Sequence, residues 1–184
     1  LAKFGWRVSS TWKWGSHSHS TVEKFGGLGG EQAHRQPYSF DVDHPECFAA
    51  EDNGATPVEL VLVGLASCLT AGIASIATLR DIQLRSVTAT IEGDMDMRGT
   101  IGVDPDVRTG FTGIRVRSNI DAAARAEDLE ALVPQRHTRA PVFDLFTTPT
   151  HATLSPNKKH ASPTRPAHVA LGDACPRMRC RPPA

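Results

Sequence analysis

The sequence predicts an α+β fold in which antiparallel β-sheet is wrapped around one long, buried central helix. Three observations favour this fold class. Segments of alternating apolar and polar residues stand on both sides of the helix, and a run of more than 20 residues between them carries almost no charge. The strands and helices also do not alternate one by one, as they would in a doubly wound parallel sheet.

The first part of the chain predicts three strands. Residues 4–14 and 18–25 are rich in Trp, Val, Ser and Thr and are separated by a Gly-Ser pair, which is typical of a β-hairpin. The glycine-rich residues 26–30 predict a flexible loop. They lack the Lys-Ser/Thr ending of a phosphate-binding loop, so we expect no nucleotide there. Residues 38–43 alternate again and predict the third strand.

The central helix is predicted over residues 56–80. Thr56 and Glu59 form the pattern of a capping box, and Pro57 stands at the first helical position, where its missing N–H costs nothing. No charge follows Glu59 until Arg80, so the helix should be buried on every side. Its length also fits a membrane span. Four hydroxyl residues interrupt the run and strands flank it, so we favour a core helix and expect no membrane partner.

The second half of the domain predicts further elements in order. These are a strand at residues 84–97, a turn at 104–110, a strand at 111–120, an amphipathic helix at 121–132 ended by Pro134, a short helical or turn segment at 141–146 and a closing strand at 151–154.

The chain divides into two parts of opposite charge. Residues 1–154, with 19 acidic and 14 basic side chains, are expected to form the folded domain. Residues 155–184 hold six of the 13 prolines, six Lys and Arg and one acid, which predicts a disordered basic tail. The net charge of zero argues against nucleic-acid binding through bulk charge. The first residues do not read as a secretory leader, so we expect a cytoplasmic protein.

The cysteines give the main candidate for chemistry. Four cysteines at irregular spacing do not form a disulfide scaffold, and Cys175 and Cys180 lack a second ligand pair, so we expect no metal and no cofactor. Cys68 lies in the middle of the predicted helix. It is either a small buried hydrophobic residue or a reactive thiol, and the second role requires a basic side chain from elsewhere in the fold.

The chain resembles the OsmC/Ohr superfamily, and most of all its OsmC-like proteins, over residues 4–154. The resemblance rests on four segments that occur in the same order: GATPVEL followed by LASCLT, EGDMDMRG, DVRTGF and PVFDLFTTP. It implies an intertwined homodimer in which sheets surround two long helices. In the peroxidase branches of the family, a helix cysteine attacks a hydroperoxide, a second cysteine resolves the sulfenic acid, and a dithiol reduces the disulfide. Cys68 stands at the peroxidatic position.

The departures from the family pattern concern the partners of Cys68. Ala140 stands where the family has its second cysteine, and Val58 where the peroxidase branch has its glutamate. Glu59 is one place later, so we take it as a helix cap first and a catalytic group second. The resemblance implies an activating arginine from the loop of the N-terminal hairpin, which reads GSHSH at residues 15–19 and has no arginine, and Arg35 is the nearest substitute.

Two other features of the N-terminal half bear on the same site. Cys47 could replace the missing second thiol only if its Cα lies within about 7 Å of that of Cys68. His17 and His19, in the hairpin, are expected to form a solvated turn and not a metal site.

The sequence thus predicts a thiol-dependent reductase of organic hydroperoxides, with Cys68 as the peroxidatic thiol, Arg35 and Glu59 as candidate catalytic partners, and an external thiol as reductant. The alternative is a non-catalytic homodimer of the same fold that binds a small apolar ligand.

Overall fold

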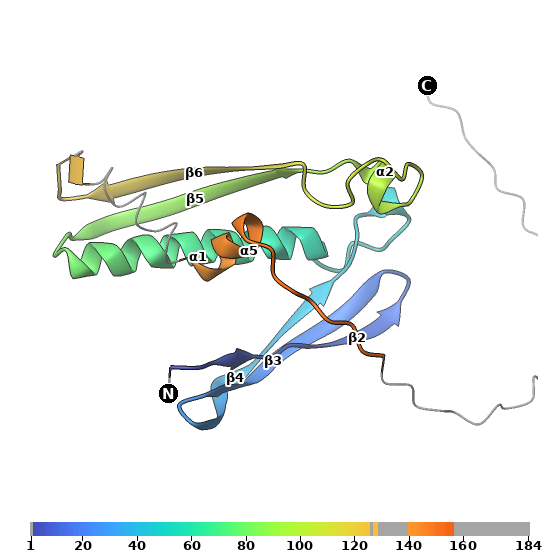
Figure 1. Ribbon diagram of the computed structural model, residues 1–184, viewed down its shortest axis with the longest axis horizontal. Coiled ribbons are helices and arrows are strands. Elements are labelled where there is room, and N and C mark those ends of the chain that lie inside the picture. Colours follow the sequence, from blue (N-terminus) through green and yellow to red (C-terminus); the bar gives the residue numbers. More distant parts are fainter. Residues whose placement is uncertain (1, 126, 129–139, 157–184) are drawn as a thin grey trace, which may run out of the picture. The chain divides into compact units, whose positions relative to one another are not determined.

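The computed structural model describes residues 2–125, 127–128 and 140–156 (Figure 1). The elements, in chain order, are β1 (Gly5–Trp6), β2 (Ser9–Trp14), β3 (His17–Gly27), β4 (Gly30–Val42), the short 3₁₀ helix η1 (Glu46–Phe48), α1 (Pro57–Leu79), β5 (Leu84–Asp94), α2 (Met97–Thr100), β6 (Gly113–Ala122) and α5 (Pro141–Thr147). Both sheets are antiparallel, which confirms the α+β class.

The N-terminal sheet is built around β3. Strands β1 and β2 pair with one edge of β3, and β4 pairs with the other. The prediction of a flexible loop at residues 26–30 is wrong, because Gly27 pairs with Gly30 and only two residues form the turn. Leu28 and Gly29 both have positive φ, 52° and 87°, as a tight hairpin turn requires. Strand β4 therefore begins at Gly30 and not at residue 38.

The second sheet pairs β5 with β6 from Leu84–Ala122 at one end to Asp94–Gly113 at the other. Strand β5 ends before residue 97, because the Asp96 side chain accepts from the backbone N–H of Arg98 (3.0 Å) and caps α2. Strand β6 continues to Ala122, so the helix predicted at 121–132 begins later than expected. Most of that prediction, with Pro134, lies outside the described residues.

Helix α1 begins as the sequence predicts. The Thr56 hydroxyl accepts from the N–H of Glu59 (3.3 Å), and the Glu59 carboxylate accepts from the N–H of Thr56 (2.8 Å). A stripe of buried residues then follows at helical spacing: Leu65, Leu69, Ile73, Ile76 and Ala77.

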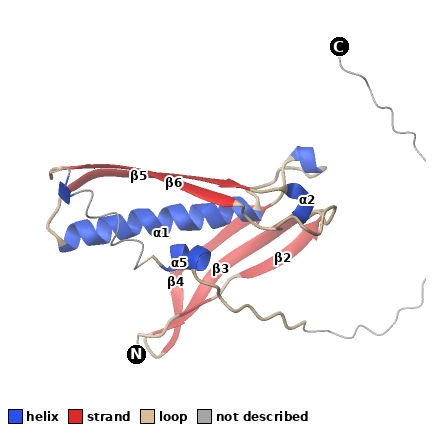
Figure 2. Cartoon of the chain, turned by 45° about the horizontal axis from the view of Figure 1, so that its top comes forward, coloured by secondary structure: helices blue, strands red, loops and turns tan. Residues whose placement is uncertain are grey.

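Sheet β5–β6 covers one side of this helix (Figures 1 and 2). Burial on every side is wrong within one chain, since Val63 and Leu79 are 56% and 76% exposed. The sheets of one chain cover only the buried stripe. Among the described residues, α1 is also the one helix long and apolar enough to cross a membrane.

The closing strand predicted at residues 151–154 is wrong, because no ladder forms there. Leu154 is 96% exposed, so the segment has no buried face of the kind a closing strand would present. Of the described residues, 151–156 belong to a unit separate from residues 1–150. The predicted disordered tail lies outside the described residues from 157 onward.

Candidate functional site

Cys68 lies on α1, half-buried, with a free thiol. It packs against an apolar cluster whose buried members are Leu65, Leu69 and Ala140. Further members come from the two strands and from the start of α5: Ile91, Ile114, Val116, Val142 and Phe143. The thiol therefore has an apolar environment made by α1, β5, β6 and α5.

Ala140 is the residue that precedes α5, and it is only 4% exposed. Pro141 begins the helix, at a position where a proline is favoured. This arrangement places Ala140 in the same cluster as Cys68. Ala140 stands where the family resemblance implies a second cysteine. This residue therefore belongs to the cluster around the thiol, and its side chain is a methyl group.

Cys47 is exposed in η1 and is also a free thiol. It is not a member of the cluster around Cys68. Cys47 as the second thiol stays a prediction.

Glu59 acts as the cap of α1. Its carboxylate accepts from the hydroxyl (2.7 Å) and the backbone N–H of Thr56, and these hydrogen bonds lower its pKa below the ordinary value. Glu59 therefore stays ionised, and its carboxylate is occupied by hydrogen bonds at the start of the helix. A catalytic role for Glu59 stays a prediction.

Arg35 is exposed on β4, and no residue of that strand belongs to the Cys68 cluster as described. In the hairpin, His17 and His19 both contact Asp41 Oδ1, at 2.9 and 3.0 Å from Nε2 and Nδ1 respectively. His17 is buried, with Trp14 packed edge-on against its ring, so a solvated turn was the wrong expectation for it. Arg35 as the activating group stays a prediction.

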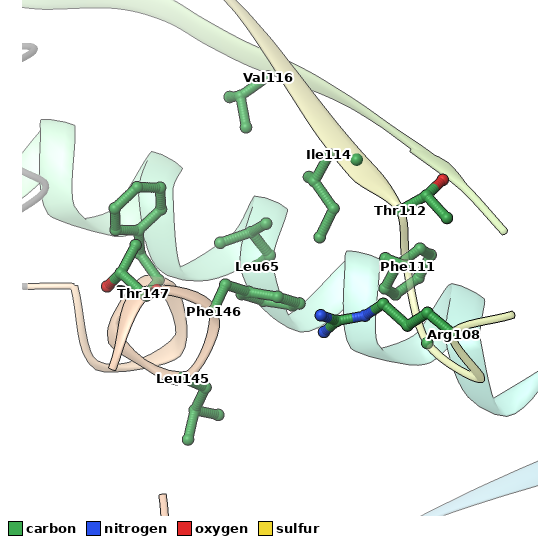
Figure 3. A pocket seen from close by; sticks show the side chains of 12 residues that line it. Leu65, Arg108, Phe111, Thr112, Ile114, Val116, Leu145, Phe146 and Thr147 are labelled. Atoms are coloured by element: carbon green, nitrogen blue, oxygen red, sulfur yellow. Dashed lines mark hydrogen bonds between the residues drawn. The ribbon is translucent and has the colours of Figure 1, made fainter. Parts of the chain in front are cut away.

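A pocket of about 570 Å³ adjoins the same cluster (Figure 3). Its apolar lining comes from α1, α5, and β6 with the residues before it: Leu65, Phe111, Ile114, Val116, Phe143, Leu145 and Phe146. Leu65, Ile114, Val116 and Phe143 also belong to the cluster that holds Cys68. Cys68 itself is not among the lining residues, so the pocket shares its walls with the cluster around the thiol and is large enough for a small organic molecule.

Arg108 also lines this pocket, and sequence reasoning missed it as a site residue. Figure 3 shows its side chain extending toward Phe146. The segment that carries it is held by contacts with α2: the Thr100 hydroxyl donates to the carbonyl of Thr109 (3.1 Å), and a Cβ at Gly99 would lie 2.6 Å from the carbonyl oxygen of Arg108. Arg108 is the arginine of the DVRTGF segment, which in the sequence supported only the family resemblance.

No group of three metal-ligating side chains occurs in the described part of the chain. His17 and His19 both contact the same carboxylate oxygen, Oδ1 of Asp41. The groups that the site offers for chemistry are therefore a thiol, an apolar pocket and a guanidinium.

These features define an α+β protein with a half-buried helix thiol next to an apolar pocket. The family model described as OsmC-like protein matches residues 50–155, which is more than half of the chain. The chain belongs to the OsmC-like protein family. No curated protein sequence matches it.

Several solved structures have the same fold. An OsmC-like protein from Mycoplasma pneumoniae is 15% identical, with 78% of this chain and 88% of that chain covered and a TM-score of 0.59. An organic hydroperoxide resistance protein OsmC from Legionella pneumophila is 21% identical, with coverages of 80% and 93% and a TM-score of 0.56. One from Elizabethkingia anophelis, with thiocyanate bound, is 19% identical, with coverages of 81% and 91% and a TM-score of 0.52. At these identities the likeness shows the fold.

Proposed function

We propose that this protein is a thiol-dependent reductase of organic hydroperoxides in which Cys68 is the peroxidatic thiol. The observation that carries the proposal is the position of a half-buried free thiol in an apolar cluster that also lines a pocket. An organic hydroperoxide has an apolar body and a reactive O–O end. The pocket would hold the body while the thiol meets the peroxide.

The reaction begins with the Cys68 thiolate attacking the terminal oxygen of the hydroperoxide. A sulfur–oxygen bond forms, the O–O bond breaks, and the leaving alkoxide takes a proton to become an alcohol. Cys68 is oxidised to a sulfenic acid and the hydroperoxide is reduced. A methyl group at Ala140 cannot condense with that sulfenic acid, and Cys47 is not in its cluster.

An external thiol therefore completes the cycle. Its thiolate attacks the Cys68 sulfur, water leaves, and a mixed disulfide forms. A second external thiol displaces Cys68 and regenerates it, while the two reductant sulfurs form a disulfide. A dithiol such as dihydrolipoamide supplies both sulfurs from one molecule.

The proposal includes a cytoplasmic homodimer. Helix α1 leaves large apolar side chains, Val63 and Leu79 among them, exposed in a single chain, and a second copy of the helix would cover them. In such a dimer Arg35 of the partner protomer is the candidate for activating the thiol, since no residue of β4 belongs to the described Cys68 cluster within one chain.

The test is consumption of cumene hydroperoxide by the purified protein with dihydrolipoamide as reductant. Loss of turnover in Cys68→Ser, with retention in Cys47→Ser, supports the proposal. Turnover that is no greater than that of Cys68→Ser overturns it.

The alternative is a non-catalytic dimer that binds a small apolar ligand. The pocket and the methyl group of Ala140 favour this alternative. A binding protein needs the pocket, and it does not need a second cysteine at position 140. A sulfenic-acid probe such as dimedone separates the two functions: labelling of Cys68 after peroxide treatment indicates the reductase, and its absence indicates the binding protein.

A further inference from the structure

Arg108 is the one charged side chain among the described residues that line the pocket. The two threonines of the lining use their hydroxyls on the backbone: Thr112 donates to the carbonyl of Asp94 (3.0 Å), and Thr147 lies 3.4 Å from the carbonyl of Asp144. Arg108 makes no ion pair with any residue that the structure describes. Its guanidinium is therefore the side-chain group of the described lining that has hydrogen-bond donors left for a bound molecule.

The backbone on both sides of Arg108 is fixed. The Thr100 hydroxyl of α2 donates to the carbonyl of Thr109, and the N–H of Thr112 is bonded to β5 (2.8 Å). Gly99 of α2 is buried, and a Cβ there would lie 2.6 Å from the carbonyl oxygen of Arg108. The guanidinium thus extends into the pocket from an anchored segment. A charge that is positioned in advance is the arrangement that stabilises a transition state.

The pocket and the thiol share a wall. Leu65 and Ile114 line the pocket and also pack in the cluster that holds Cys68. Cys68 follows Leu65 by three residues, so the two side chains lie on the same side of α1, one turn apart. Figure 3 shows the Arg108 side chain extending into the pocket toward Phe146. A small molecule that reaches Cys68 from the pocket would therefore also have Arg108 as a neighbour.

The proposed reaction creates a negative charge at the oxygen that leaves. When the Cys68 sulfur bonds to the terminal oxygen of a hydroperoxide, the O–O bond breaks and its electron pair goes to the inner oxygen. That oxygen is an alkoxide until water protonates it. An alkoxide in an apolar pocket is costly without a hydrogen-bond donor. A guanidinium keeps its protons and donates strong hydrogen bonds to an oxyanion.

We propose that Arg108 is a further catalytic residue of this reaction, which donates a hydrogen bond to the leaving oxygen as the O–O bond breaks. The role differs from that proposed for Arg35, which would activate the thiol before the attack. It rests on the proposed function for the reaction itself. Because this hydrogen bond is stronger to the alkoxide than to the intact hydroperoxide, it lowers the barrier more than it tightens binding.

The test measures the rate of Cys68 oxidation in the full chain, in single-turnover experiments with dimedone trapping. Arg108→Gln should slow the reaction with cumene hydroperoxide about 100-fold, the cost of removing one donor to an oxyanion, and Arg108→Lys should keep part of the rate. Perbenzoic acid also carries an aromatic ring but releases benzoate, a weak base, so its rate should fall less than about tenfold. Arg117→Gln, an arginine of β6 that pairs with Glu92 and does not line the pocket, should leave both rates unchanged.

Alkylation of Cys68 by iodoacetamide breaks no O–O bond, and its rate should change little in Arg108→Gln. The role of Arg108 would be overturned by an unchanged rate with cumene hydroperoxide in this variant. Equal losses with the two oxidants, or an alkylation rate that falls as far as the oxidation rate, would also overturn it. A wild-type Cys68 that is not oxidised overturns the proposed function and this role together, whereas equal oxidation of wild type and Arg108→Gln overturns the role alone.

Discussion

Ala140 and Cys68 pack in the same apolar cluster, although 72 residues separate them in the sequence. Ala140 is buried immediately before α5, and Cys68 lies on α1 next to Leu65 and Leu69. A cysteine at position 140 would therefore stand near the thiol without exposing new surface. This relationship gives the most specific prediction of the account.

Ala140→Cys is expected to install a resolving thiol. With one equivalent of cumene hydroperoxide, the variant should lose two free thiols and form a disulfide between positions 68 and 140, as peptide mass spectrometry would show. Leu145→Cys, at an exposed position of α5, is the control and should not form that disulfide efficiently. A stable sulfenic acid in Ala140→Cys would contradict the predicted proximity of the two side chains.

Leu69→Ala should destabilise the fold, because Leu69 is completely buried between the helix and its neighbours. The expected loss is about 2–5 kcal/mol of unfolding free energy, measured by urea denaturation. A loss below about 1 kcal/mol would show that the cluster is not a close-packed core.

Val63→Glu tests the proposed homodimer. Val63 is two residues from Leu65 and so points to the opposite side of α1, where it is exposed in one chain. A charge in an apolar interface should raise the dissociation constant at least about tenfold, measured by analytical ultracentrifugation. Val103→Glu, in an exposed loop position, should leave the association state as it is. A monomeric wild-type chain would contradict the dimer.

Glu59→Gln separates the capping role of Glu59 from a catalytic one. Glutamine still accepts from the N–H of Thr56, so the capping box survives and the melting temperature should change little. Glu59→Ala removes the acceptor and should cost about 1 kcal/mol. A strong loss of turnover in Glu59→Gln at unchanged stability would assign the carboxylate to catalysis.

Asp43 predicts an acid-sensitive loop. It is buried, and its carboxylate accepts from Ser16 (2.6 Å), from the N–H of His44 (2.8 Å) and from the side chain of Asn53 (2.8 Å). These hydrogen bonds, that of Ser16 first, hold its pKa far below the ordinary value of 3.8.

Since the folded-state pKa is the lower one, Asp43 stabilises the fold above pH 3.8 and loses that contribution as the pH falls further. The wild-type melting temperature should therefore fall below that pH. Asp43→Asn should melt several degrees lower than wild type at neutral pH and respond less to acid. Glu46→Gln, an exposed acid in the same loop, is the control; an equal response of both variants would contradict the assignment.

Local sequence patterns were sufficient to predict the elements that depend on neighbouring residues. The capping box of Thr56 and Glu59 involves atoms three residues apart, and the alternation of β5 corresponds to one half-buried face of the strand. The strand predicted at residues 151–154 failed for the opposite reason, because a strand exists only if another backbone pairs with it, and no described strand pairs with this segment.

The candidate site was predicted only in part. Cys68 and the importance of Ala140 followed from the family resemblance, which fixes positions along the chain. Arg108 did not, because it lines the pocket only in the fold that brings Leu65 and Phe146 beside it. That proximity is not local in the sequence.

The most direct test of the central claim is dimedone labelling of the full chain after one equivalent of cumene hydroperoxide, read by peptide mass spectrometry. The account predicts a dimedone adduct on Cys68 and none on the same peptide of Cys68→Ser. A Cys68 peptide that remains unlabelled while the hydroperoxide persists would contradict it.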